Sequence, residues 1–157
     1  MKIQQLEREQ WIARPLSVVF DFFSRAENLG RITPAWIGFR IRTPIPIEMR
    51  VGARIEYTIR LVGVPMKWRT CIIAWEPERG FVDVQERGPY ALWEHHHHFT
   101  PLGDGVLVVD RVRYALPLGP LGRLAHAVAV RATLAAIFDY RHRRVRALLG
   151  GGEVDDE

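Results

Sequence analysis

Four consecutive histidines, residues 95–98, are the part of this sequence whose side chains could most readily do chemistry. Residues typical of β-strands flank them on both sides. Alternate residues of a strand share one face, so one face of this strand carries Trp93, His95, His97 and Phe99. The two aromatic residues predict that this face is the buried one, which would direct two imidazoles toward the protein interior.

Two histidines at positions i and i+2 of a strand can chelate a metal, and imidazole suits zinc, copper or iron. A third ligand would have to come from a neighbouring strand, and Asp110 or Glu86 could supply it. The alternative is that His95 and His97 are polar residues lining a cavity and held by hydrogen bonds. We favour this alternative and expect neither a metal nor another cofactor.

Asp110 is the second candidate, because it lies among valines on the apolar face of the strand predicted for residues 106–116. Tyr114 follows on the same face. A carboxylate among apolar neighbours is rarely left unpaired. If this strand forms a hairpin with the strand before it, Asp110 lies near His95 or His97, and such a pair could act as an acid and base. The catalytic candidates are Asp110, His95, His97 and Tyr114, although for Asp110 we favour a purely structural buried pair, for example with an arginine.

Aromatic side chains with polar tips recur at inward-facing positions of the predicted strands. They suit a pocket for a flat or lipid-like molecule, although ordinary core packing would explain any one of them. With the polar candidates and two positions on the C-terminal helix, the predicted ligand-binding residues are Tyr57, Trp68, Glu86, Tyr90, Trp93, His95, His97, Asp110, Tyr114, Ala132 and Phe138.

The element that must support these strands is a long helix predicted for residues 119–150. Pro120 suits its first position and Gly150 its end. Its predicted apolar face consists of Leu121, Leu124, Val128, Leu134, Phe138, Val145 and Leu148. Beside that face runs a line of small residues, Ala125, Ala129, Ala132 and Ala136. This line would either let the helix pack closely on the sheet or leave room for a ligand.

The rest of the chain reads mainly as strands joined by Gly- and Pro-containing turns, a pattern typical of hairpins. Two short helices, near residues 18–23 and 26–32, follow a first strand at 3–12. The later strands are predicted at 36–42, 54–61, 66–75, 81–87, 90–100 and 106–116. A sheet of this size must bury one face, and only the long helix can cover it. We therefore expect one α+β domain at 1–150, followed by a disordered acidic tail at 151–157.

This order of elements resembles the helix-grip fold of the START-like, or SRPBCC, superfamily. Local segments are similar to bacterial members of the polyketide cyclase/dehydrase type, namely Trp75-Glu76-Pro77, Gly88-Pro89-Tyr90 and Asp110-x-Val112-x-Tyr114-x-Leu116-Pro117. The resemblance implies a curved antiparallel sheet of about seven strands wrapped around the C-terminal helix, with two short helices between the first and second strands. It also implies an apolar ligand cavity between sheet and helix.

The composition of the chain excludes few classes of protein. The net charge is +4 and the pI is about 9.7, but the arginines are spread along the chain except for a cluster at 141–146. A single cysteine, Cys71, excludes an internal disulfide. The N-terminus lacks an apolar signal core, and we expect no transmembrane segment and a cytoplasmic location.

Three functions remain open, because one fold can host many functions. The leading hypothesis is a carrier that binds a small hydrophobic ligand, either lipid-, aromatic- or polyketide-like, under the long helix. The first alternative is a cyclase- or dehydratase-like enzyme that uses Asp110, His95 or His97 as acid and base. The second is a basic adaptor for RNA, the ribosome or a protein partner, although nucleic-acid binding is not favoured. The sequence does not indicate an oligomeric state.

Overall fold

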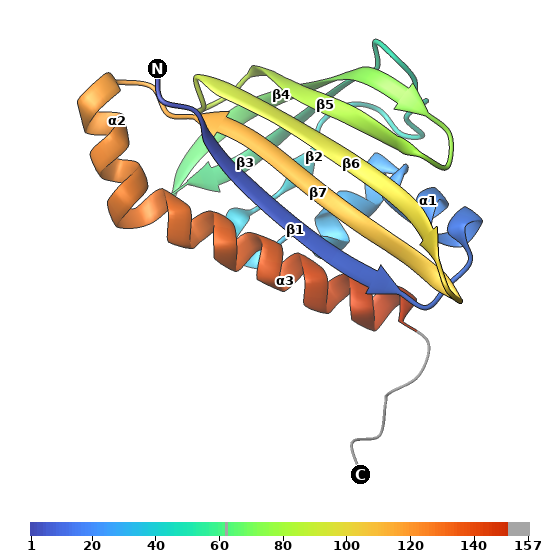
Figure 1. The fold of residues 1–157 in the computed structure, drawn as a ribbon. Coiled ribbons are helices and arrows are strands. Elements are labelled where there is room, and N and C mark those ends of the chain that lie inside the picture. The colour runs from blue at the N-terminus through green and yellow to red at the C-terminus, as the bar shows by residue number, and fades with distance from the viewer. Residues whose placement is uncertain (62, 151–157) are drawn as a thin grey trace.

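The computed structural model describes residues 1–61 and 63–150, and its central feature is one antiparallel sheet in the order β1-β7-β6-β5-β4-β3-β2 (Figure 1). The strands are β1 (Gln4–Ile12), β2 (Arg40–Ile41), β3 (Arg54–Leu61), β4 (Val64–Glu76), β5 (Gly80–Arg87), β6 (Leu92–Leu102) and β7 (Gly105–Ala115). The predicted seven-stranded α+β architecture is confirmed. The predicted tail at 151–157 lies outside the described residues.

Three short helical segments connect β1 to β2, namely α1 (Leu16–Phe23), η1 (Ala26–Ile32) and η2 (Ala35–Ile37). The first two match the predicted short helices. The strand predicted at 36–42 is wrong for its first half, where η2 lies instead. Gly38 ends that turn in the left-handed conformation with φ of 61°, which glycine adopts without steric cost.

The long C-terminal helix consists of α2 (Gly119–Ala125), a π-helical turn η3 (His126–Val130) and α3 (Arg131–Leu149). Figure 1 shows α3 running along the sheet, whereas α2 extends beyond the end of the sheet. By length and composition the helix is apolar enough to cross a membrane, with a mean hydropathy of 1.4 over 18 residues, but helices that pack in the core of a protein meet the same criterion.

The helix buries a different line of residues from the one predicted. The buried side chains of α3 belong to Leu134, Phe138, Arg141, Val145 and Leu149, whereas Leu121, Leu124 and Val128 are exposed. A π-helical turn adds a residue to one turn, so the apolar residues before it do not continue the buried line after it. The predicted single apolar face is therefore wrong for the first half of the helix.

The line of alanines also faces solvent. Ala125, Ala129, Ala132 and Ala136 are all exposed, so they neither pack closely on the sheet nor border a cavity. Ala132 and Ala136 lie in α3 two positions before the buried Leu134 and Phe138, and residues two apart in an α-helix point to opposite sides, so the prediction that they lie beside the buried face is wrong.

The sheet curves around the helix, and two features favour this curvature. The register of the β4–β5 pair shifts at two places, between Arg69 and Thr70 and between Ile72 and Ala74; such bulges bend a strand and increase its twist. At Gly80 the backbone of β5 passes so close to the carbonyl oxygen of His97 that a Cβ atom would collide with it. Glycine here thus fixes the strand that carries His97 closely against β5.

The hydrophobic core is divided along the length of the sheet. A large cluster that includes Val19, Ile72, Val106 and Val145 fills one end. Smaller clusters around Trp68 and around Phe138, Leu134 and Val112 fill the other. The space between these clusters holds the candidate functional site.

Candidate functional site

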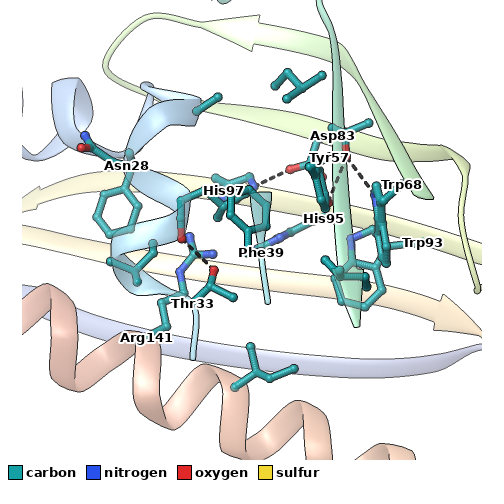
Figure 2. A pocket seen from close by; sticks show the side chains of 18 of the residues that line it. Asn28, Thr33, Phe39, Tyr57, Trp68, Asp83, Trp93, His95, His97 and Arg141 are labelled. Carbon is teal, nitrogen blue, oxygen red and sulfur yellow. Dashed lines mark hydrogen bonds and ion pairs between the residues drawn. The ribbon is translucent and has the colours of Figure 1, made fainter. Parts of the chain in front are cut away.

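A cavity of about 200 Å³ lies between the concave face of the sheet, α3 and the short helices (Figure 2). Its walls are mainly aromatic and aliphatic. The aromatic side chains are those of Phe22, Phe23, Phe39, Tyr57, Trp68, Phe81, Tyr90, Trp93 and Phe138. α3 contributes one side of the cavity through Leu134, Ile137, Phe138 and Arg141.

One wall is a group of aromatic rings whose polar atoms are partly satisfied within the wall. The rings of Tyr57 and Trp68 stack at 5.8 Å between centroids, and Trp93 meets Trp68 edge-on at 5.5 Å. The indole N–H of Trp68 donates to Thr70 Oγ1 at 3.0 Å. Because that donor has a partner, the wall can present apolar ring surface to a ligand at little cost in unsatisfied polar groups.

Next to these rings lie two histidine–aspartate pairs, with His95 6.4 Å from Trp93 between ring centroids. His97 Nε2 lies 2.7 Å from Asp83 Oδ2, and His95 Nε2 lies 2.8 Å from Asp110 Oδ1. The two imidazole rings stack with centroids 3.7 Å apart. Figure 2 shows Asp83, His95 and His97 together on one side of the cavity. The alternation of β6 places both histidines inward, and β5 and β7 supply the carboxylates from either side.

Arg141 brings a positive charge to the same end of the cavity. Its guanidinium is buried and its Nη2 atom lies 3.7 Å from Asp110 Oδ1. The guanidinium carbon also lies over the rings of Phe23, at 5.5 Å, and Phe138, at 5.8 Å. A buried cation needs such partners. Asp110 thus contacts both His95 and Arg141.

The two histidines have opposite protonation behaviour. Burial is the largest influence on His95; with the nearby His97 it outweighs the aspartates and lowers the pKa of His95 to about 4. Burial also acts to lower the pKa of His97, but Asp110 and Asp83 together raise it above its ordinary value. His97 Nδ1 is 3.4 Å from Asp110 Oδ1 without the alignment of a hydrogen bond, so we assign the stronger contact to Asp83. His97 is therefore the histidine that holds a proton.

Both aspartates stay ionised despite being enclosed. Burial raises the pKa of Asp110, but the charge of Arg141, the hydrogen bond from His95 and the nearby His97 more than offset it and hold the pKa well below its ordinary value. The pKa of Asp83 is also lowered, because the hydrogen bond from His97 and the nearby positive charges together outweigh burial. At a pH below the raised pKa of His97, two carboxylates, one guanidinium and one imidazolium leave this end of the cavity with no net charge.

Asp83, His95 and His97 also bring three possible metal-ligand atoms within 4.8 Å of one another. The predicted third ligands were Asp110 and Glu86, and the structure brings in Asp83 instead. A metal needs a neutral imidazole, whereas His97 favours a proton here. We therefore interpret the group as a hydrogen-bonded one.

Seven of the eleven predicted ligand-binding residues line this cavity, namely Tyr57, Trp68, Tyr90, Trp93, His95, His97 and Phe138. The other four do not. Asp110 lies behind the histidines, and Ala132 faces solvent. Glu86 is on the outer face of β5, where it pairs with Arg54 at 2.9 Å; the alternation that turns Phe81 and Asp83 inward turns Glu86 outward. The hydroxyl of Tyr114 is 2.7 Å from His126 Nε2, so this predicted catalytic candidate is engaged outside the cavity.

Sequence reasoning missed two residues of the polar end. Asp83 is two positions after the buried Phe81, so the period of a strand could have placed it inside. Arg141 is three positions after Phe138 and seven after Leu134, so the period of a helix could have placed it on the buried face. Instead, Arg141 was interpreted as one of a cluster of surface arginines.

That arginine cluster does not form one basic surface. Arg141 is buried, Arg143 lies over the ring of Tyr140 at 6.0 Å, and Arg144 donates to the carbonyl oxygen of Arg31 at 3.1 Å. The cluster predicted for an RNA or protein adaptor is thus divided among different structural contacts.

Comparison with solved structures finds the same fold in proteins of low sequence identity. A protein from Chromobacterium violaceum, CV1439, has a TM-score of 0.69 at 12% identity, covering 94% of this chain and 98% of the other. Ginseng major latex-like protein 151 from Panax ginseng has a TM-score of 0.67 at 17% identity, covering 94% and 97%. TTHA0849 from Thermus thermophilus has a TM-score of 0.65 at 17% identity, covering 92% and 99%. These likenesses confirm the predicted helix-grip fold.

Comparison with protein families matches residues 43–149 to the model described as "Domain of unknown function (DUF8410)". The match includes β3 to β7 and the whole long helix, and therefore all four members of the histidine–aspartate group and Arg141. A comparison with curated proteins found no match.

Proposed function

From the premise that this chain belongs to the DUF8410 family and has the helix-grip fold, we propose that it binds a small apolar molecule in the cavity under α3. The observation that carries this proposal is the cavity itself, which combines aromatic walls with a histidine–aspartate end. Ligand sites of proteins commonly have this composition, with mostly apolar walls and a few polar groups that fix orientation.

The size and charge of the cavity narrow the class of ligand. A volume of about 200 Å³ is below the usual range for drug-sized ligands, so a small ring system fits better than a large lipid. The polar end is balanced, because Asp83 and Asp110 are matched by Arg141 and the His97 proton. A neutral polar group such as a hydroxyl or a ketone would leave this balance intact, whereas a charged group would disturb it.

Two matched probes test both parts of this proposal. Isothermal titration of 2-naphthol and of naphthalene compares one ring system with and without a hydroxyl. We expect both to bind at one site per chain, and 2-naphthol to bind about tenfold more tightly, because one good hydrogen bond is worth about 1 kcal/mol or more. Saturable binding of neither probe would contradict ligand binding in this cavity, and equal affinities would contradict the role of the polar end.

The His97–Asp83 pair favours a second candidate function, acid–base catalysis of the cyclase or dehydratase type. The pair holds a proton donor and an ionised carboxylate 2.7 Å apart on the cavity wall. His97 could protonate the oxygen of a ketone while Asp83 accepts a proton from the adjacent carbon, which forms the enol. The reverse transfers would regenerate the ketone and complete one round of proton exchange at that carbon. Asp110, which does not line the cavity, would then support the histidines from behind.

Deuterium exchange at the α-carbon of 2-tetralone, a bicyclic ketone, tests this second function directly. We expect the wild type to accelerate exchange over buffer and His97→Gln to lose about a hundredfold of that acceleration. The matched control His98→Gln changes the adjacent imidazole, which is outside the cavity lining, and should exchange like the wild type. Exchange at the buffer rate in the wild type would rule out acid–base catalysis on this ketone and leave the binding function as proposed.

A further inference from the structure

Four large apolar side chains at the start of the long helix are left uncovered by the described part of the chain. Leu118, the residue that caps the helix, is 75% exposed, and Leu121, Leu124 and Val128 within the helix are 69%, 61% and 74% exposed. The spacing of the three helical residues, three and four positions apart, places them along one side of the helix. We call these four residues the apolar arm. Figure 1 shows that α2 extends beyond the end of the sheet.

The body of the protein fixes which side of the helix faces outward. Gly122 and His126 are buried on the opposite side, and His126 Nε2 contacts the hydroxyl of Tyr114 at 2.7 Å. This contact joins the π-helical turn to β7. The apolar arm is therefore held outward by the fold, and rotation of the helix to bury it would break a buried hydrogen bond.

The surroundings of the apolar arm are basic. The sequence contains no aspartate or glutamate from Arg111 to Phe138. Arg123 and Arg131 belong to the helix itself, and Lys2 lines the same small hollow as Arg123 and Leu118. Among residues 1–61 and 63–150, none of these three cations forms an ion pair, whereas Arg111 and Arg113 pair with Glu7 and Glu94.

We propose that the apolar arm binds the surface of an anionic lipid bilayer. Exposed apolar side chains enter the interfacial layer of a membrane, and basic neighbours are attracted to anionic headgroups. The charge argues against a second copy of this chain as the partner, because two arms packed together would bring Arg123 and Arg131 near their own copies without any acidic residue between them. The helix lies on the bilayer and does not cross it, because α3 packs Leu134, Phe138 and Val145 against the sheet.

Sedimentation with lipid vesicles tests this proposal on the full chain. The probes are vesicles of phosphatidylcholine alone and vesicles of equal parts phosphatidylcholine and phosphatidylglycerol. We expect binding to the anionic vesicles that weakens at high salt, and much weaker binding to the neutral ones. The double variant Leu121→Gln/Leu124→Gln should bind the anionic vesicles at least about tenfold more weakly, because it removes two apolar insertions.

Two matched variants separate the apolar and electrostatic parts. Leu102→Gln changes a leucine that is 53% exposed at the end of β6 and should bind vesicles like the wild type. Arg123→Gln/Arg131→Gln should lose about fivefold per charge on anionic vesicles and little on neutral ones. Unchanged circular dichroism and unchanged 2-naphthol binding would show that each variant is folded.

Three results would overturn the proposal. The first is that the wild type fails to bind anionic vesicles. The second is that the Leu121→Gln/Leu124→Gln variant binds them as well as the wild type does. The third is a dimer in light scattering that the same double variant converts to a monomer, because the apolar arm would then belong to an interface between two copies.

Discussion

At the scale of single residues, Asp110 is the centre of the polar end. Its carboxylate accepts from His95 at 2.8 Å and faces Arg141 at 3.7 Å while being almost fully buried. Removing one partner of a buried charged group costs more than the pair contributes, because the other charge is left without compensation. Asp110 therefore matters for the stability of the fold although it does not line the cavity.

We expect Asp110→Asn to lower the free energy of unfolding by roughly 3–5 kcal/mol. Chemical denaturation measures this change. The control is Glu86→Gln, which breaks the exposed pair with Arg54 and should cost no more than about 1 kcal/mol. Equal losses in the two variants would show that Asp110 is not a buried charge centre.

His97 should make stability depend on pH above neutrality. Its pKa in the folded protein is raised, so its contribution is full below the ordinary value of about 6.5 and is lost as pH rises through the raised value. The groups that face it are Asp83, Asp110, His95 and Arg141. Of these, His95 has a pKa lowered to about 4. Its effect is that the free energy of unfolding increases as the pH rises from about 4 to 6.5, and it adds no further change above pH 6.5.

We therefore expect the free energy of unfolding of the wild type to fall above pH 6.5, with a slope of at most about 1.4 kcal/mol per pH unit for one proton. His97→Gln should flatten this slope relative to the wild type. Urea denaturation at several pH values between neutrality and mild alkalinity measures it. The same slope in both proteins would contradict the assignment of the proton to His97.

The burial of several site residues could be predicted because side chains of a strand alternate between its two faces. The alternation of Trp93, His95, His97 and Phe99 placed both histidines inside, and the structure has both buried. The partner of His97 could not be found in this way. Asp83 contacts it across β5 and β6, and that register depends on how the turn between the strands is formed.

At the scale of elements, the long helix departs from the prediction because its α-helical period is interrupted. Its position over the sheet was predicted correctly, but the π-helical turn at His126–Val130 separates two halves with different faces toward the protein. No proline or glycine lies within that turn to signal it. The buried side of the first half, which consists of Gly122 and His126, therefore depends on how the helix packs and not on an apolar pattern.

A pair of helix variants tests this assignment of faces. Ala132 is exposed and Leu134 is 4% exposed, although both were predicted to lie on or beside the buried face. We expect Ala132→Leu to change the free energy of unfolding by less than about 0.5 kcal/mol, and Leu134→Ala to lower it by roughly 2–5 kcal/mol. Thermal or chemical denaturation would contradict the assignment if Ala132→Leu were the more damaging change.

At the scale of the whole molecule, the order of elements was enough to predict the architecture. A meander of strands that ends in one long helix has few ways to bury its apolar faces, and the helix-grip arrangement is one of them. The boundaries of the cavity could not be predicted, because they depend on side chains from the short helices, four strands and α3 meeting in space. The fold does not distinguish a ligand carrier from an enzyme, because that difference depends on the side chains of the site.

The central claim is that the cavity under α3 binds a small apolar molecule, and one measurement tests it most directly. Titration calorimetry measures the affinity for 2-naphthol of the wild type and of two variants. Ile137 lines the cavity, so Ile137→Phe places a larger side chain there. Ala136 is exposed, so Ala136→Phe is the matched control. We expect Ile137→Phe to weaken binding by at least about tenfold and Ala136→Phe to bind like the wild type. Equal affinity in all three proteins would contradict the claim, because the ligand would then lie outside this cavity.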